Sequence, residues 1–498
     1  MEQLHTLAAH DQATQLAAAD AIAEIVRDPD SLPPLRSRLV RSPAIPPLPR
    51  HFVGRDELLA GLLTELDGSG RGLTQTMSGL GGVGKTTIAA AFAEAASAQV
   101  DIVWWVRAED PISLMTDLAA LGDRCGIVGD DDIARRAVQV RDYLTDTDRR
   151  WVLVFDNAVD EPSIFEWVPR RGTGITLVTT RNQNFDRIGA VVEVGVLAKE
   201  VATEFLSRRV AERNQAAATD TARIEEVAHE LQGLPLALEQ AGAWVAGSTL
   251  RSFGEYLDLL RDVRDNPFPD GTVPLGYERT MWETIQISVD ASERDSAGAG
   301  EVWQLLGWFA SEAIPIAWLA EGGAPLVEKA AELRRLRQAV EALATYSLVR
   351  VRPSEDGGEV DVHRVVQAAG RRASAPASAD RGLDVLEVQN GGDRLHPDAW
   401  PTLLRLRPHA QAYAEHVRSG IADRVPRLWR VLNGTATATQ LSGGVHAAVP
   451  MFETNLDLVE SALGDRHPDT LTARANLALS YQSAGRVTDA IDLEERVL

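Results

Sequence analysis

The sequence is poor in cysteine, in long apolar runs and in positive charge. A single cysteine, Cys125, among 498 residues excludes an internal disulfide framework and a cysteine-based zinc cluster. No apolar run reaches the roughly 18 residues of a membrane-spanning helix, and the start, with Glu2, His5 and Asp11, does not resemble a secretory signal. Lys and Arg number 50 against 72 Asp and Glu, and the resulting net charge of −22 argues against a nucleic-acid or anionic-membrane surface. We therefore expect an acidic cytoplasmic protein.

The length of the chain predicts several domains, because one hydrophobic core rarely serves more than about 250–300 residues. Residues 1–28 are rich in alanine, with apolar side chains roughly at helical spacing, which predicts one or two helices. A proline-rich extended linker, "SPAIPPLPRHF", occupies residues 42–52. We treat residues 1–45 as an N-terminal helical segment with its linker, too short to form an effector domain.

From the linker to about residue 200, short β-rich runs alternate with helical patterns. The continuous apolar runs at 101–106, 150–155, 174–180 and 190–194 suit strands buried on both faces of a parallel sheet that helices cover. The run "GLTQTMS" at 72–78 is more polar, but its threonines favour extended backbone. The pattern predicts an α/β domain.

A glycine-rich loop follows that last run and opens a helix. Residues 79–86 read "GLGGVGKT" and fit the pattern G-x-x-x-x-G-K-[ST]. Glycines let the backbone curl so that several N–H groups point at phosphate oxygens, and the following helix adds its positive end. Lys85 is expected to reach the β- and γ-phosphates, and the Thr86 hydroxyl to join a Mg²⁺ shell. The residues predicted to bind ADP or ATP here are Gly79, Gly81, Gly82, Val83, Gly84, Lys85, Thr86 and Thr87.

Magnesium also needs a carboxylate at the end of a neighbouring strand. Asp156 follows the apolar run "WVLVF" and is predicted to be that ligand, although an aspartate after a strand is by itself usually a helix cap. Many P-loop ATPases place an acidic residue next, to orient the attacking water. This chain has Asn157, which cannot accept a proton, and Asp160 is out of register. We expect at most slow ATP hydrolysis.

The second half of the chain is mostly helical by pattern. Residues 200–262 carry apolar side chains at helical spacing, and residues 278–375 end with a strand, an acidic turn, a second strand and a helix. "LEERVL" repeats the pattern of "MFETNL" 42 positions later, as Leu493 follows Met451. Helical units of this kind need neighbours to bury their apolar faces. An ordinary helical hairpin is the alternative, and we expect that further repeats once followed Leu498.

Six ordered motifs resemble those of the NB-ARC branch of STAND NTPases, which are signal-transducing P-loop proteins. They are "HFVGRDELL", "GLGGVGKTT", "LVFDN", "TLVTTR", "GLPLALEQAG" and "VHRVVQ". The resemblance covers about residues 46–375 and implies a nucleotide-binding domain at 46–198, an ARC1-like helical domain at 199–265 and a winged-helix domain at 275–378. The repeats at 390–498 resemble the TPR units of kinesin light chains.

The resemblance also implies roles for single residues. By this resemblance, the base and sugar of the nucleotide lie beside Val53, Gly54 and Arg55. Arg181 matches the arginine that senses the γ-phosphate, and Pro235 matches the proline that packs on adenine. His363 matches the histidine that contacts the β-phosphate of ADP, although a histidine after a strand is more often structural. In the family that histidine is commonly followed by Asp, whereas Arg364 follows here.

The function implied by the resemblance is that of a signalling switch. It would rest closed with ADP, exchange nucleotide when the repeats sense a protein or peptide trigger, and then open and oligomerise. Two alternatives stay open: a working ATPase with the repeats as substrate adaptor, and a transcriptional regulator that uses its winged helix. The net charge of −22 opposes the second, despite the local basic clusters at 334–338 and 370–373.

Overall fold

A computed structural model describes most of the chain. The described residues are 39–68, 73–127, 132–182, 185, 187–263, 276–320, 326–354, 357–392, 395–417 and 424–494. The helices expected at 1–28 lie outside these ranges, as does most of the final "LEERVL". Among the described helices, none combines the length and apolar character needed to cross a membrane.

A parallel sheet lies in the first half of the chain, with strands in the order β1-β3-β4-β5-β2-β6. The strands are β1 (Val40–Arg41), β2 (Leu73–Ser78), β3 (Ile102–Arg107), β4 (Trp151–Ala158), β5 (Ile175–Thr180) and β6 (Ala190–Glu193). The predicted parallel α/β core is therefore confirmed. One detail differs, because β6 is mostly exposed rather than buried on both faces. It forms the edge of the sheet and has only β2 beside it.

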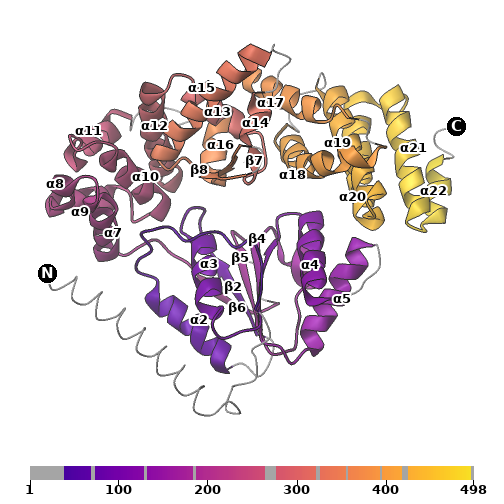
Figure 1. Ribbon diagram of the computed structural model, residues 1–498, viewed down its shortest axis with the longest axis horizontal. Coiled ribbons are helices and arrows are strands. Elements are labelled where there is room, and N and C mark those ends of the chain that lie inside the picture. The colour runs from indigo at the N-terminus through magenta and orange to yellow at the C-terminus, as the bar shows by residue number, and fades with distance from the viewer. Residues whose placement is uncertain are drawn as a thin grey trace.

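Helices cover both faces of this sheet (Figure 1). Successive side chains of a strand point to opposite faces, so Trp105 packs on one side and Trp104 on the other. The Trp105 face is covered by α2 (Asp56–Gly68) and α3 (Lys85–Ala96). The Trp104 face is covered by α4 (Pro111–Cys125) and α5 (Ile133–Asp146). A short helix, α6 (Glu161–Phe165), follows β4.

The rest of the chain forms an arch of helices above the sheet domain (Figure 1). Its first part contains α7 (Lys199–Ala211), α8 (Gln215–Ala218), α9 (Thr221–Glu230), α10 (Pro235–Ala246) and α11 (Phe253–Val263). A second part contains α12 (Gly276–Asp295), α13 (Ala299–Leu306), α14 (Ile316–Leu319), α15 (Leu326–Thr345) and α16 (Arg364–Ala373). One continuous cluster of buried side chains runs through both parts and reaches Ala438. The domain limits expected within this region stay predictions.

A small antiparallel sheet of order β7-β9-β8 belongs to the second part of the arch. Its strands are β7 (Ile314–Pro315), β8 (Val349–Arg352) and β9 (Glu359–Val362). Strands β8 and β9 form the hairpin predicted before residue 375. Strand β9 leads directly into α16, so the hairpin fixes where that helix begins.

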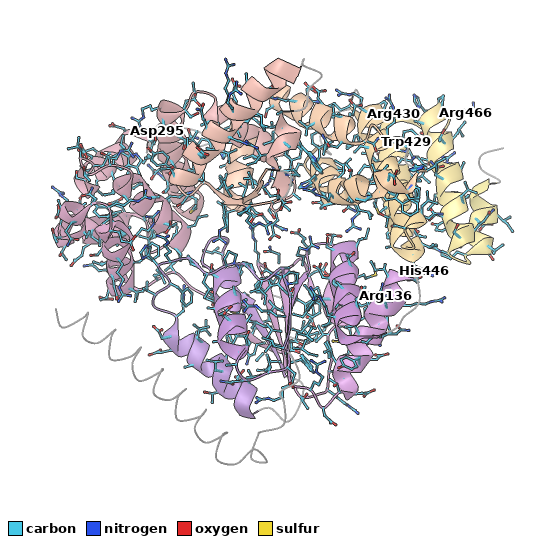
Figure 2. The ribbon with its side chains drawn as sticks, in the orientation of Figure 1. Arg136, Asp295, Trp429, Arg430, His446 and Arg466 are labelled. Carbon is cyan, nitrogen blue, oxygen red and sulfur yellow. The ribbon has the colours of Figure 1, made fainter. Side chains whose placement is uncertain are left out.

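Antiparallel helices complete the arch. They are α17 (Pro376–Gln389), the 3₁₀ turn η2 (Pro397–Ala399), α18 (Trp400–Val417), α19 (Val425–Leu441), α20 (Val445–Leu463), α21 (Pro468–Ser483) and α22 (Val487–Glu494). Small buried residues lie where these helices approach closely, among them Ala436, Ala447 and Ala473. Helix α20 also packs against α5 of the sheet domain, and the labelled His446 lies near Arg136 in Figure 2. The repeats thus contact the sheet domain directly.

Candidate nucleotide site

The glycine loop lies between β2 and α3, as predicted. Its backbone enters the left-handed region at Gly82, with φ 85°, and at Gly84, with φ 95°, which glycine adopts without steric cost. Lys85 Nζ donates hydrogen bonds to the carbonyl oxygens of Gly79, at 2.7 Å, and Leu80, at 2.9 Å. A Cβ on Gly79 would lie 2.5 Å from the carbonyl oxygen of Val194, so only glycine fits there. The half-buried Thr86 and Thr87 follow in the first turn of α3.

A carboxylate and two hydroxyls meet beside this loop. Thr86 Oγ1 donates to Asp156 Oδ1 at 2.9 Å, and Thr179 Oγ1 donates to the same oxygen. Burial raises the pKa of the Asp156 carboxyl, while the hydrogen bonds from Thr179 and Thr86 and the charge of Lys85 lower it. The structure therefore brings together the two predicted magnesium ligands, and oxygen donors of this kind suit Mg²⁺.

The sequence analysis did not single out Thr179. It lies in β5, which pairs with β4, and its hydroxyl both donates to Asp156 and accepts from the backbone N–H of Asn157 at 2.9 Å. Asn157 has φ 61°, a left-handed conformation that asparagine tolerates better than most residues. The only sequence signal for Thr179 was its place near the carboxyl end of a neighbouring strand.

Three basic side chains gather around the loop from different parts of the chain. Burial and, to a smaller extent, the positive charge of Arg181 lower the pKa of Lys85 to about 8, against the opposing charge of Asp156. His363 keeps access to solvent but is deeply set among protein atoms. Desolvation, followed by the charges of Arg181 and Lys85, lowers the pKa of His363 to about 4. The charges of Lys85 and Arg181 repel one another, and an anion beside them would relieve that repulsion.

The start of α16 covers the loop. His363 is its N-cap, and His363 Nδ1 accepts a hydrogen bond from the Val365 N–H at 3.2 Å. A Cβ built on Gly81 would lie 3.1 Å from Val365 Cγ2 and 3.4 Å from Arg181 Cζ. Glycine at this position thus lets α16 and Arg181 approach the loop closely.

Of the other residues expected at the nucleotide, Arg55 and Pro235 lie beside the loop. Arg55 Nη2 donates to the carbonyl oxygens of Gly195, at 2.6 Å, and Val83, at 3.4 Å. The N–H of Leu236 donates to the Gly82 carbonyl at 3.3 Å, which places Pro235, the first residue of α10, beside the loop. Gly54 has φ 71°, and a Cβ there would lie 2.1 Å from Val201 Cγ1, so this turn is restricted to glycine. Val53 instead packs against the core of the helical arch.

Family comparisons agree with this geometry. Residues 56–216 match the NB-ARC domain family, and residues 430–498 match the tetratricopeptide repeat family. The chain therefore contains an NB-ARC domain, whose P-loop implies nucleotide binding. Tetratricopeptide repeats follow it toward the C-terminus, and the resemblance found in the sequence is confirmed to this extent. Among curated proteins, none matches the sequence significantly.

Solved structures give distant similarities. A Signal Transduction ATPase with Numerous Domains (STAND) protein with a tetratricopeptide repeat sensor, from Pyrococcus horikoshii, is 14% identical, with a TM-score of 0.44. The match covers 91% of this chain and 64% of that chain, so this chain spans less than two thirds of that protein's length. Cdc6p from Pyrobaculum aerophilum is 12% identical, with a TM-score of 0.31, and the match covers 66% of this chain and 97% of that one. Domain III of the replication initiation protein DnaA from Thermotoga maritima is 14% identical, with a TM-score of 0.26 and coverage of 48% and 97%.

Proposed function

We propose that this protein is a signalling switch of the STAND type, which rests closed with ADP and exchanges it for ATP when its repeats bind a trigger. The observation that carries the proposal is the position of α16. His363 and Val365 lie over the phosphate-binding loop, next to Arg181 and Lys85. A nucleotide held by the NB-ARC domain would therefore lie beneath the start of α16. Whether the site is occupied would then affect how firmly α16 stays over the loop.

The residues around the loop have complementary parts in this proposal. Lys85 and the backbone N–H groups of the loop would hold the phosphates, and Thr86 and Asp156 would hold Mg²⁺, which would neutralise phosphate charge. His363 is kept neutral near pH 7 by its depressed pKa. Because its Nδ1 accepts from Val365, its Nε2 carries the hydrogen and is available to donate to an anion.

Slow hydrolysis is part of the proposal. The residue after Asp156 is Asn157, whose backbone N–H is bound to Thr179 and whose amide side chain cannot act as a base. The site thus lacks an acid in the position that orients water in many P-loop ATPases. We infer that the protein is at most a slow ATPase and uses nucleotide mainly to hold a state.

The repeats would supply the trigger site. Tetratricopeptide repeats are protein-interaction units, and α20 contacts α5, with His446 Nε2 at 2.9 Å from Asp132 Oδ2. A partner that moves α20 would therefore act on the nucleotide domain without an intermediary. Opening would expose surfaces for self-association, and a cytoplasmic location and an unidentified protein or peptide trigger belong to the same proposal.

The test is the nucleotide carried by freshly purified protein, released by denaturation and separated by ion-exchange chromatography. We expect ADP near one equivalent, lost in Lys85→Ala and retained in the control Lys199→Ala, which removes only an exposed ion pair with Glu225. Nucleotide-free protein with fast ATP turnover would refute the switch and favour an ATPase with an adaptor. If the protein carries no nucleotide and does not turn over ATP, the remaining interpretation is a repeat scaffold.

A further inference from the structure

The start of α16 contacts the nucleotide domain at a second point, away from the phosphate loop. Arg364, the first residue of α16, forms an ion pair with Glu109, which lies in the connection between β3 and α4. Its side chains are 36% and 23% exposed, respectively. The pair is thus partly buried and less screened by solvent than a surface pair.

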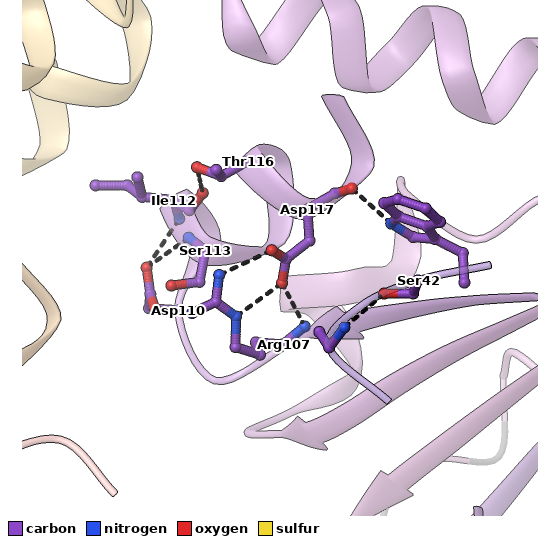
Figure 3. Close-up of polar contacts among 9 residues, drawn as sticks. Ser42, Arg107, Asp110, Ile112, Ser113, Thr116 and Asp117 are labelled. Carbon is purple, nitrogen blue, oxygen red and sulfur yellow. Dashed lines mark hydrogen bonds and ion pairs between the residues drawn. The ribbon is translucent and has the colours of Figure 1, made fainter. Parts of the chain in front are cut away.

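The connection that carries Glu109 is held on both sides (Figure 3). Before it, Arg107 makes a two-pronged contact with Asp117, with Nε to Oδ2 at 2.9 Å and Nη2 to Oδ1 at 2.8 Å. After it, Asp110 Oδ1 caps α4 by accepting from the N–H groups of Ile112, at 3.0 Å, and Ser113, at 2.9 Å. Because the backbone is fixed, pairing costs Glu109 side-chain entropy but no further backbone entropy.

Other charges around Arg364 make the pairing with Glu109 consequential. Burial and, to a smaller extent, the charge of Arg364 lower the pKa of Arg371 to about 10. Burial also lowers the pKa of His416 to about 4, with contributions from Arg371 and Arg364. Glu415 is a second acidic group in range of Arg364. Loss of Glu109 would leave Arg364 among these basic groups with Glu415 as the nearby acid.

We propose that the Arg364–Glu109 ion pair is a latch that holds α16 closed over the phosphate loop independently of the nucleotide. Arg364 lies between His363, which faces Lys85 and Arg181, and Val365, which abuts Gly81. Movement of Arg364 away from Glu109 therefore moves both residues that cover the loop. The latch rests on the proposed switch and adds to it a polar contact that regulates ADP release.

The latch predicts a charge-reversal pattern in the release of ADP. A fluorescent ADP analogue is bound to the full chain and chased with excess ADP, and its dissociation rate is followed by stopped flow. Arg364→Glu and Glu109→Arg should each speed release by about three- to thirtyfold, since each reversal turns an attraction within a partly buried pair into a repulsion. The double reversal should return the rate to within about threefold of wild type. The neutral variants Arg364→Gln and Glu109→Gln should speed release less than the reversals.

Controls separate the latch from neighbouring effects and from the switch itself. Glu415→Gln, which keeps Glu109, should release the analogue at nearly the wild-type rate, and thermal unfolding checks that each variant is folded. If a charge-reversal variant fails to fold, Arg364→Gln, Glu109→Gln and their double variant allow the same double-mutant analysis. Single variants with wild-type release, or a double variant whose effects simply add, would overturn the latch. A wild-type protein that binds no ADP would instead overturn the proposed function.

Discussion

Thr179 offers a sharp test of how the acidic end of the site is built. Its side chain is 1% exposed, and its hydroxyl donates to Asp156 and accepts from the N–H of Asn157. Thr179→Val keeps the shape but removes both hydrogen bonds. A bond to a charged group is worth about 1.5–3 kcal/mol, and a buried N–H without a partner costs about 1–3 kcal/mol. We expect local destabilisation of roughly 2–4 kcal/mol, allowing for partial relaxation.

The same strand provides the matched control. Thr176 in β5 is 0% exposed, and within the described part of the chain its hydroxyl has no hydrogen-bond partner. Thr176→Val should therefore leave stability unchanged or raise it. Hydrogen exchange of the β4 and β5 amides reports local opening, and Thr179→Val should speed exchange roughly 30- to 700-fold at about 1.4 kcal/mol per tenfold. Equal effects of the two substitutions would refute the reasoning.

The charge of Asp156 determines how the effect of Thr179→Val should depend on pH. Burial raises the pKa of this carboxyl and Thr179 lowers it, so Thr179→Val should raise the pKa further. An acid whose folded pKa is raised costs stability when ionised, and this cost disappears once the pH falls below its unfolded pKa. The penalty of Thr179→Val should thus be larger at pH 7 than in acid. In an Asp156→Asn background the penalty should shrink at pH 7 and lose its pH dependence.

Three other predictions follow from single residues. Asn157→Glu should raise steady-state ATP turnover above wild type by restoring a carboxylate after Asp156, and unchanged phosphate release would show that another feature limits hydrolysis. Gly174→Ala should lower the free energy of unfolding by about 2 kcal/mol or more, because its Cβ would lie 2.1 Å from the Trp151 carbonyl oxygen. A wild-type free energy of unfolding in a denaturant titration would contradict this contact. Without bound nucleotide, opening should return the pKa of His363 from about 4 toward its ordinary 6.5, so protonation favours the open state and hydrogen exchange at the start of α16 should speed up as pH falls from 7 to 5. His363→Gln should remove that pH effect, and an unchanged pH profile would show that His363 does not titrate on opening.

Local sequence patterns were enough to predict much of the sheet domain. The runs at 101–106, 150–155 and 174–180 became β3, β4 and β5 because continuous apolar residues can be buried on both faces. The glycine loop has a local signature because its geometry depends on consecutive residues. The edge position of β6 could not be read from its own apolar run, since strand order is decided by partners elsewhere in the chain.

Contacts between distant segments could not be predicted from these patterns. Thr179 reaches Asp156 only because β5 pairs with β4, and Glu109 pairs with Arg364, which lies 255 positions later in the chain. The sequence showed only that Arg364 stands where related proteins commonly carry Asp. The role of Arg364 depends on the carboxylate of Glu109, which the fold brings from the sheet domain. No local sequence pattern predicts that pairing.

Two of the contacts between the arch and the sheet domain differ in physical character, which bears on how the proposed trigger could act. The contact of the repeats with the sheet domain includes apolar side chains, since Met451 and Phe452 of α20 share one buried cluster with Val140 of α5, and one polar pair, His446 with Asp132. The contact of α16 includes the Arg364–Glu109 pair and the basic groups around the phosphate loop. Salt should therefore weaken the second contact more than the first. A trigger changes the balance only through its different affinity for the closed and open states. A trigger that competes with α5 for α20 would have such a difference, whereas one that binds repeats away from α20 would need to move that helix to have any effect.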